Sequence, residues 1–400
     1  MSFISQRLLS VKPSPTLGAT QKAAELKVQG KQILSLSAGE PDFATPSWIC
    51  EAAVKALQQG QTRYTAVGGT PELKRAIIEK FKRENDLDYA GKEIIASCGG
   101  KHVIFNALLA TLNPGDEVII PAPYWVSYPD MVAIAEGTPV IVACPESQGF
   151  KLTPQQLERS ITPQTKWLIL NSPSNPTGAV YSRNELLGLA EVLRAHTHVY
   201  ILSDDIYEHI LFTEDRFWTL AQVEPRLKER TLTMNGVSKS YAMTGWRLGY
   251  AGGPEHLIKA MTDLQSHSTS NPSSISQAAA VAALNGPQGF LREWRDSFRK
   301  RRDLMLEGFK RIPSLCGTLA QGAFYLYPSC EEVLGKKTPD GEILASDEDV
   351  CRYLLASVGI SVVHGAAFGL SPHFRISHAC DTETLKKACV LMAKAFGDLV

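Results

Sequence analysis

The most informative part of the chain reads Asn235-Gly236-Val237-Ser238-Lys239-Ser240-Tyr241-Ala242-Met243-Thr244-Gly245-Trp246-Arg247-Leu248-Gly249. An apolar, strand-like segment precedes it, and Arg247 follows Lys239 after eight positions. A lysine that forms a Schiff base must be partly desolvated, so that some of its amine is unprotonated near neutral pH. Small neighbours leave room for a cofactor ring, and a fixed arginine can grip a phosphate with two hydrogen bonds. The alternative is that Lys239 is a solvated lysine in a Ser/Gly loop. The other segments of the chain must distinguish these two interpretations.

The composition is that of an ordinary globular protein, with 400 residues, 44% apolar and 20% charged. This length predicts two to three domains. The 41 basic and 41 acidic residues cancel, which argues against a nucleic-acid partner. The eight cysteines form no Cys-x-x-Cys pair, so we expect neither a zinc site nor a disulfide scaffold. No apolar run reaches the ~20 residues of a membrane helix, and we expect a cytoplasmic protein without a membrane partner.

Short apolar runs alternate with helical patterns through the middle of the chain. Continuous apolar strands separated by helices predict an α/β fold with a mostly parallel sheet covered on both faces. We expect seven strands in one large domain, residues 46–285, at 93–98, 117–121, 139–143, 166–171, 199–204, 231–235 and 248–252.

The two ends of the chain predict a second, smaller unit. Residues 286–400 begin with a long charged helix, 289–309, and continue with short strands near 323–327, 360–363 and 374–378 and a closing helix from Thr382. This pattern is typical of a smaller α+β domain. The N-terminal segment, residues 1–45, is rich in Pro, Gly and Ser, and we expect it to pack on that smaller domain.

Loops that follow strands of an open α/β sheet are where ligands bind. Gly99-Gly100-Lys101 follows the first expected strand and opens a helix. Two glycines at a helix N-terminus expose backbone N–H groups to a phosphate, although such a pair is often only a turn. The loop is not a Walker P-loop, because Ile95 and His102 occupy two of its required positions. It also lacks the Gly-x-Gly-x-x-Gly pattern of dinucleotide enzymes.

Two further loops carry polar groups after strands. In Asn171 to Gly178, two X-Pro bonds make a rigid turn that would present the amide of Asn175, although a plain turn is equally consistent. In Ser203-Asp204-Asp205-Ile206-Tyr207, Asp204 and Tyr207 are three apart and share a side of one helical turn. A carboxylate there could hold a pyridine nitrogen protonated, whereas Asp205 is equally suited to capping a helix.

Two more residues are candidates for ligand contacts. Trp125 follows Pro-Ala-Pro-Tyr in a loop and could stack on a planar ring, or be a core aromatic. Arg375 alternates with apolar neighbours on an expected strand. A buried arginine needs a partner, and a carboxylate suits it.

Together these segments resemble the class I, fold-type I pyridoxal-phosphate-dependent aminotransferases, in particular the bacterial aspartate aminotransferases of the aspartate/prephenate branch. The resemblance covers nearly the whole chain. It rests on Lys12-Pro13-Ser14, Ser37 to Phe43, Thr62-Arg63-Tyr64, Gly99-Gly100-Lys101, Pro123-Tyr124-Trp125, Asn171 to Gly178, Asp204 to Tyr207, the Lys239 segment and Phe374-Arg375.

The resemblance implies a cofactor, pyridoxal 5'-phosphate, and a role for each matching residue. Lys239 forms the Schiff base and moves the proton, and Asp204 pairs with the pyridinium nitrogen. The remaining implied contacts are Tyr207 and Asn175 to the ring oxygen, Trp125 to the ring face, Gly99, Gly100 and Arg247 to the phosphate with Tyr64 of a second subunit, and Arg375 to the substrate α-carboxylate with Gly39 and Asn175.

Two departures from the family pattern affect this assignment. Many relatives carry a phosphate-binding serine where this chain has Gly236, and Ser238 or another group would have to compensate. The arginine that other aspartate aminotransferases use for the distal carboxylate has no match within residues 265–277. In this branch the resemblance assigns that carboxylate to Lys101 with Thr16, and we expect Lys12 to assist prephenate.

The resemblance therefore implies a homodimer with shared active sites that transfers an amino group between L-aspartate and 2-oxoglutarate, and also to prephenate. Another pyridoxal-phosphate reaction, such as β-lyase or aromatic transamination, stays open. A non-catalytic cofactor-binding sensor is the alternative of a different class, although no DNA-binding segment accompanies these residues.

Overall fold

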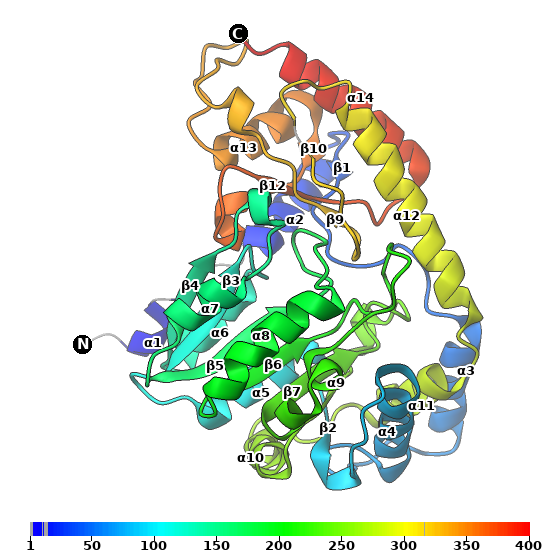
Figure 1. Ribbon diagram of the computed structural model, residues 1–400. Helices are drawn as coiled ribbons and strands as arrows, with labels where there is room; N and C mark the ends of the chain where they lie inside the picture. The colour runs from blue at the N-terminus through cyan, green and yellow to red at the C-terminus, as the bar shows by residue number, and fades with distance from the viewer. Residues whose placement is uncertain (1–2, 10, 12–14, 316) are drawn as a thin grey trace.

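The computed structural model describes residues 3–9, 11, 15–315 and 317–400. Two parts are stacked in Figure 1, the lower one built on a sheet and the upper one formed by both ends of the chain. The sheet contains β2 (Ile94–Ser97), β3 (Glu117–Ala122), β4 (Thr138–Ala143), β5 (Thr165–Asn171), β6 (Tyr200–Asp204), β7 (Thr231–Gly236) and β8 (Gly249–Gly252).

The sheet is mostly parallel. Its strand order is β2-β8-β7-β6-β5-β3-β4, and β8 runs antiparallel to both of its neighbours. The other pairings are parallel. The predicted seven-stranded, mostly parallel α/β sheet is therefore confirmed, with each strand close to its expected position.

Alternate side chains of the strands enter cores on opposite faces of the sheet, as the two-residue period of a strand requires. On β5, Trp167 and Ile169 pack in one core while Leu168 and Leu170 pack in the other. The first core includes residues of α5 (Gly100–Thr111), α6 (Ser127–Ile134) and α10 (Glu255–Ser266). The second includes residues of α7 (Pro154–Ser160), α8 (Arg183–Ala195) and α9 (Leu220–Val223). Helices thus cover both faces.

Beside β2 and β8, a third core adds residues of α3 (Ser47–Gln58), α4 (Pro71–Asn85) and α11 (Ser274–Asn285). None of the helices in the described part of the chain has the length and apolar character that a bilayer crossing requires.

The upper part combines both ends of the chain. The C-terminal third supplies a three-stranded sheet of β11 (Val363–His364), β12 (Phe374–Ser377) and β9 (Tyr325–Leu326), with α12 (Gly289–Phe309), α13 (Asp347–Val358) and α14 (Thr382–Gly397). The N-terminal segment supplies α2 (Pro15–Val28) and β1 (Leu34–Ser35), and β1 pairs in parallel with β10 (Ile360–Ser361). The predicted smaller α+β unit is confirmed, while its limits at residues 45 and 285 stay predictions.

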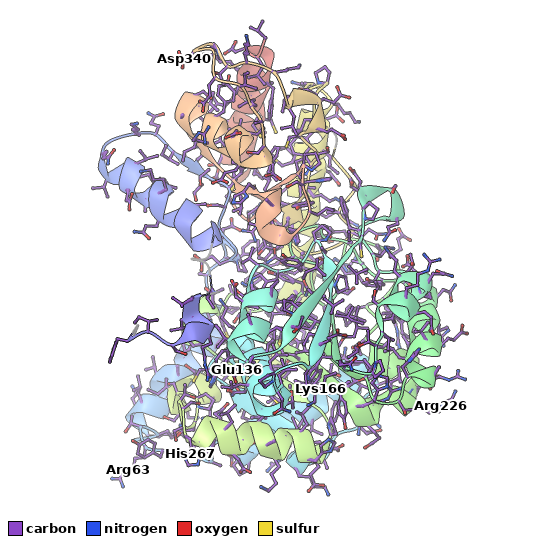
Figure 2. The ribbon with its side chains drawn as sticks, turned by 90° about the vertical axis from the view of Figure 1, so that its left-hand side faces the viewer. Arg63, Glu136, Lys166, Arg226, His267 and Asp340 are labelled. Atoms are coloured by element: carbon purple, nitrogen blue, oxygen red, sulfur yellow. The ribbon has the colours of Figure 1, made fainter. Side chains whose placement is uncertain are left out.

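One element of the N-terminal segment lies elsewhere than expected. Helix α1 (Gln6–Leu9) contacts α6 of the lower part, and its Arg7 pairs with Glu136 at 3.2 Å. Figure 2 places Glu136 beside this helix, well away from Asp340 in the upper part. The later portion of the N-terminal segment, from α2 onward, packs on the smaller unit.

The two parts meet in close backbone contact at the turn that ends in Gly178. The amides of Gln321 and Gly322 both donate to the Gly178 carbonyl at 2.9 Å. Gly178 has φ +68°, and a Cβ there would lie 2.5 Å from the Gly322 carbonyl oxygen. The turn therefore leaves no room for a side chain between the two parts.

We predict that Gly178→Ala destabilises the protein far more than Gly149→Ala. Gly149 has almost the same backbone angle, φ +69°, and its Cβ would meet only the flexible Lys151 side chain at 3.4 Å. Both variants carry the left-handed backbone cost of ~1–2 kcal/mol, and overlap with fixed backbone should add about 1–3 kcal/mol at Gly178. Calorimetric melting of the two variants checks this, and equal losses would contradict the close junction.

Candidate active site

A cavity of about 250 Å³ opens where the carboxyl ends of the parallel strands face the upper part. Lys239 reaches it from the loop after β7, and its Nζ donates to the Gly39 carbonyl at 2.6 Å. The lining residues are Gly39, Gly100, Lys101, Ile104, Trp125, Val126, Ser127, Asn171, Asn175, Asp204, Ile206, Tyr207, Met234, Ser238, Lys239, Thr244, Arg247, Tyr325 and Arg375.

One corner of the cavity combines a helix N-terminus with an arginine. Helix α5 begins at Gly100, and its cap residue Gly99 has φ +91°. A Cβ on Gly249 would lie 2.2 Å from the Gly100 nitrogen, so the two backbones touch directly. A Cβ on Gly99 would lie 2.5 Å from Arg247 Nη2, which places that guanidinium against the loop. A helix N-terminus beside an arginine suits a phosphate group.

A buried carboxylate occupies another side of the cavity. Asp204 is 4% exposed, and it accepts hydrogen bonds from the Tyr128 hydroxyl at 2.5 Å and the Ile206 amide at 3.3 Å. Burial raises the pKa of Asp204 to about 6, although the Tyr128 hydrogen bond opposes the rise. A carboxylate in this setting gains from a cationic partner.

The amine of Lys239 is also shifted by burial, in the direction of its neutral form. Burial, with help from the nearby cations Arg375 and Arg247, lowers its pKa to about 8, although Glu40 and Asp204 oppose the shift. A larger fraction of the amine is therefore free at neutral pH than for an ordinary lysine, as nucleophilic and general-base roles require.

Arg375 is held rigidly where β12 reaches the cavity. It is 1% exposed, and it donates to the Asn175 side chain at 2.9 Å and to the Ser37 carbonyl at 2.7 Å. Its Nε has no hydrogen-bond partner among the described residues. Since a buried guanidinium is costly without an anionic partner, this corner is suited to a carboxylate.

Lys101 lies across the ring of Trp125, with its Nζ 4.9 Å from the ring centroid. Burial lowers the pKa of Lys101, and Arg247 adds to the effect. The predicted ring-stacking tryptophan and the predicted carboxylate-binding lysine thus line the same cavity, in contact with each other.

Most of the predicted site residues converge on this cavity, whereas two of those with described side-chain positions, Gly99 and Tyr64, are not among its lining residues. Gly99 lies directly beside it, against Arg247. Tyr64 is 91% exposed, and in Figure 2 its neighbour Arg63 points outward at the end of the molecule opposite Asp340. Thr16 lies in the first turn of α2, with no described side-chain position, and Lys12 lies outside the described residues.

Gly236 lies in a tightly packed part of the site. A Cβ there would lie 3.1 Å from Ile206 Cδ1 and 3.3 Å from the Leu248 carbonyl oxygen. Ser238, the residue expected to compensate, lines the cavity.

Sequence reasoning missed two tyrosines at the site. Tyr128 is buried behind Asp204, and Tyr325 lines the cavity with its hydroxyl 2.9 Å from that of Tyr207. A buried tyrosine in an apolar stretch is typical of core packing, so no sequence signal separated these two from core residues.

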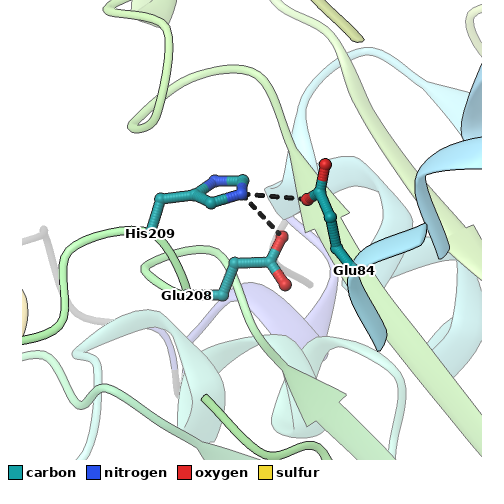
Figure 3. Close-up of side chains that lie close together, drawn as sticks. All are labelled: Glu84, Glu208 and His209. Carbon is teal, nitrogen blue, oxygen red and sulfur yellow. Dashed lines mark hydrogen bonds and ion pairs between the residues drawn. The ribbon is translucent and has the colours of Figure 1, made fainter. Parts of the chain in front are cut away.

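A second cluster, behind the cavity, has the residue types of a metal site. Ligand atoms of Glu84, Glu208 and His209 lie within 4.8 Å of one another (Figure 3). However, Lys80 forms ion pairs with both carboxylates, and Asn235 donates to Glu208 at 2.7 Å. We therefore interpret this cluster as an ion-paired network.

This network joins the two segments that carry Asp204 and Lys239. On one side His209 pairs with Glu84 at 2.9 Å (Figure 3). On the other side it contacts the Ser240 hydroxyl at 2.8 Å. Glu208 binds Asn235, four residues before Lys239. The Lys239 loop is thus fixed on both sides by residues that directly follow the Asp204 segment.

The geometry agrees with a comparison to known families. The chain matches a family model described as aminotransferase class I and II over residues 31–391. The chain belongs to this aminotransferase family. Its predicted family membership is thereby confirmed.

The aminotransferase has close relatives along its whole length. It is 56% identical to an aspartate/prephenate aminotransferase of Cereibacter sphaeroides, over 97% of each chain. The crystal structure of an aspartate aminotransferase from Rhizobium meliloti superposes with a TM-score of 0.97, at 54% identity and full coverage of both chains. An aspartate aminotransferase from Thermus thermophilus, solved with maleate, gives a TM-score of 0.92 at 42% identity, covering 99% of this chain and 100% of that one.

We predict that Lys239 is labelled at lower pH than the other lysines of the aminotransferase. With any bound cofactor removed, competitive acetylation should be half-maximal near pH 8 at Lys239, the value to which burial lowers its pKa. Ordinary lysines titrate near ~10.4. Asp204→Asn removes a carboxylate that favours the ammonium form, so it should lower the midpoint further. Labelling of Lys239 together with the bulk lysines would contradict its desolvation.

Proposed function

We propose that the chain is an aspartate aminotransferase that uses pyridoxal 5'-phosphate. It moves the amino group of L-aspartate to 2-oxoglutarate, giving oxaloacetate and L-glutamate, and it also accepts prephenate to give arogenate. The observation that carries this proposal is the meeting, in one cavity, of Lys239 with a lowered pKa, the buried Asp204 and the buried Arg375.

The residues present fit the cofactor. Asp204 is a buried carboxylate of raised pKa, which gains from the protonated nitrogen of a pyridine ring. The N-terminus of α5 and Arg247 offer donors for a phosphate. The residues that would hold the group are Lys239 at the aldehyde, Asp204 at the ring nitrogen, Tyr207 and Asn175 at the ring oxygen, Trp125 at the ring face, and Gly99, Gly100, Ser238 and Arg247 at the phosphate.

When bound, pyridoxal phosphate supplies an aldehyde that condenses with amines and a protonated ring that draws electrons from the substrate Cα. Lys239 supplies the base. Its neutral amine would accept the proton of the substrate Cα and, as an ammonium, would supply that proton again later in the reaction. Positioned proton transfer of this kind contributes roughly 10²–10⁴-fold to the rate.

The substrate would be held by its carboxylates. Arg375 can form a two-point contact with the α-carboxylate, assisted by Asn175 and the backbone of Gly39. Lys101 supplies the charge for the distal carboxylate. A lysine places less geometric demand on its partner than an arginine, which suits a site that accepts aspartate, glutamate and the bulkier prephenate. Thr16 would assist Lys101, and Lys12 would contact prephenate.

The active enzyme would be a homodimer with shared sites. Tyr64 is 91% exposed and lies outside the cavity of its own chain, as suits a residue that reaches the phosphate of a partner chain. The seven described cysteines are free, which fits the reducing cytoplasm as the place of the reaction.

Removal of the lysine tests the function directly. Lys239→Ala should lower aspartate–2-oxoglutarate turnover at least about 10³-fold, because it removes both the Schiff-base partner and the base. Asp204→Asn should bind the cofactor but turn over poorly, since a neutral partner no longer favours the protonated ring. Asp205→Asn is the matched control, because Asp205 is equally buried but bonds to Ser203 and does not line the cavity.

Near-normal transamination by Lys239→Ala would refute the assignment. A larger loss in Asp205→Asn than in Asp204→Asn would move the ring-nitrogen role to Asp205.

Specificity for acidic substrates should depend on Lys101. Lys101→Met keeps an apolar stem against Trp125 and removes the charge, so it should lower kcat/KM for aspartate by roughly 10–150-fold. Leucine and phenylalanine should be spared. Parallel measurements with the three amino acids check this. An equal loss on all three would show that Lys101 serves the cofactor phosphate instead of the distal carboxylate.

A further inference from the structure

Tyr325 lies at the junction of the cavity's two halves. It comes from β9 of the upper part, where it is paired with Ser377 of β12, two residues from Arg375. Residues two apart on a strand share a face, and the tyrosine ring lies 4.5 Å from the Arg375 guanidinium. Its hydroxyl is 2.9 Å from that of Tyr207, which belongs to the lower part.

The position of Tyr325 is closely constrained. Its side chain is fully buried, and a Cβ on Gly39 would lie 3.2 Å from its hydroxyl oxygen. It thus lies against Arg375 and Tyr207, and it leaves no free space beside Gly39. Tyr325 is therefore placed between the residues that the proposed function assigns to the substrate and those that it assigns to the cofactor ring.

We propose that Tyr325 is a positioning residue that links the carboxylate-binding Arg375 to Tyr207 and strengthens Tyr207 as a hydrogen-bond donor. This inference rests on the proposed function, since it takes the ring oxygen of pyridoxal phosphate as the acceptor of the Tyr207 proton.

Which of the two tyrosine hydroxyls donates the hydrogen bond follows from the number of protons that each one carries. Burial raises the pKa of both Tyr207 and Tyr325, so each keeps its single proton at neutral pH. A phenol donates once, and if Tyr207 donates to the ring oxygen, its own oxygen must accept from Tyr325. Donors in such a chain polarise one another, so the Tyr325 hydroxyl makes Tyr207 a stronger donor.

Loss of the Tyr325 hydroxyl should therefore raise the pH at which the bound cofactor loses its proton. Tyr207 becomes a weaker donor, the ionised ring oxygen is less stabilised, and the bound cofactor holds its proton to higher pH. The cation–π contact with Arg375 acts separately, because a phenylalanine keeps the ring and a leucine removes it.

The test is a pH titration of the visible absorption band of the cofactor-loaded protein. Tyr325→Phe should raise the midpoint by about 0.5–1 pH unit, the size expected for one hydrogen bond. Tyr327→Phe is the matched control, because Tyr327 is equally buried in the same segment but donates to the Leu370 carbonyl at 2.6 Å and does not line the cavity.

Two further variants separate coupling from general repacking. If Tyr325 acts through Tyr207, Tyr207→Phe and the double variant with Tyr325→Phe should share one midpoint. Maleate, an unreactive dicarboxylate, should bind Tyr325→Phe within about twofold of the unaltered protein and bind Tyr325→Leu several-fold more weakly.

An unchanged or lowered midpoint in Tyr325→Phe would overturn the coupling, as would an equal shift in Tyr327→Phe. Additive shifts in the double variant would overturn action through Tyr207. If the unaltered protein holds pyridoxal phosphate with no band that aspartate bleaches, the proposed function itself fails, and the coupling fails with it.

Discussion

The active site depends on one backbone contact, between Gly249 on β8 and the Gly99–Gly100 loop. A Cβ on Gly249 would lie 2.2 Å from the Gly100 nitrogen and 2.5 Å from the Gly99 carbonyl carbon. Because no side chain intervenes, the N-terminus of α5 lies directly on the strand that follows Arg247. Lys239 precedes Arg247 by eight residues in the same segment. The helix N-terminus with Arg247 and the buried amine of Lys239 are therefore placed by one short stretch of chain.

Asp204 and Lys239 are buried at the cavity, in a setting that disfavours the charged form of each. The pKa of Asp204 rises to about 6 and that of Lys239 falls to about 8, both chiefly through burial. For Asp204 the folded protein binds the proton more tightly than the unfolded chain, so its ionisation lowers stability as pH rises from about 4 through 6. For Lys239 the unfolded chain binds the proton more tightly than the folded protein, so stability falls as pH drops from about 10.5 through about 8. A cationic ring bonded to Asp204 and an amine consumed in a Schiff base would remove both costs.

The sequence predicted the strands and loop residues that follow from local pattern. It did not predict positions and roles that arise from contacts between distant parts of the chain. Apolar runs located the sheet, and polar loops after its strands pointed to Lys239, Asp204 and Asn175, because ligand sites of α/β folds follow strand ends. Arg375 stood out as a charged residue within an apolar strand, which needs an anionic partner when buried. Tyr128 and Tyr325 were missed because a buried tyrosine has the same sequence signature whether it packs or bonds a functional group. The contact between α1 and α6 was not foreseen, because it joins residues more than a hundred positions apart.

The central claim is that Lys239, of all lysines in the chain, is the one bonded to pyridoxal phosphate. Borohydride reduction of the loaded protein makes that bond permanent, and peptide mass spectrometry then locates the pyridoxyl group. The account predicts one modified lysine per chain, within the peptide that contains Lys239, and protection from labelling when aspartate is added before the reductant. A pyridoxyl group on Lys101 or on surface lysines, with Lys239 unmodified, would contradict it.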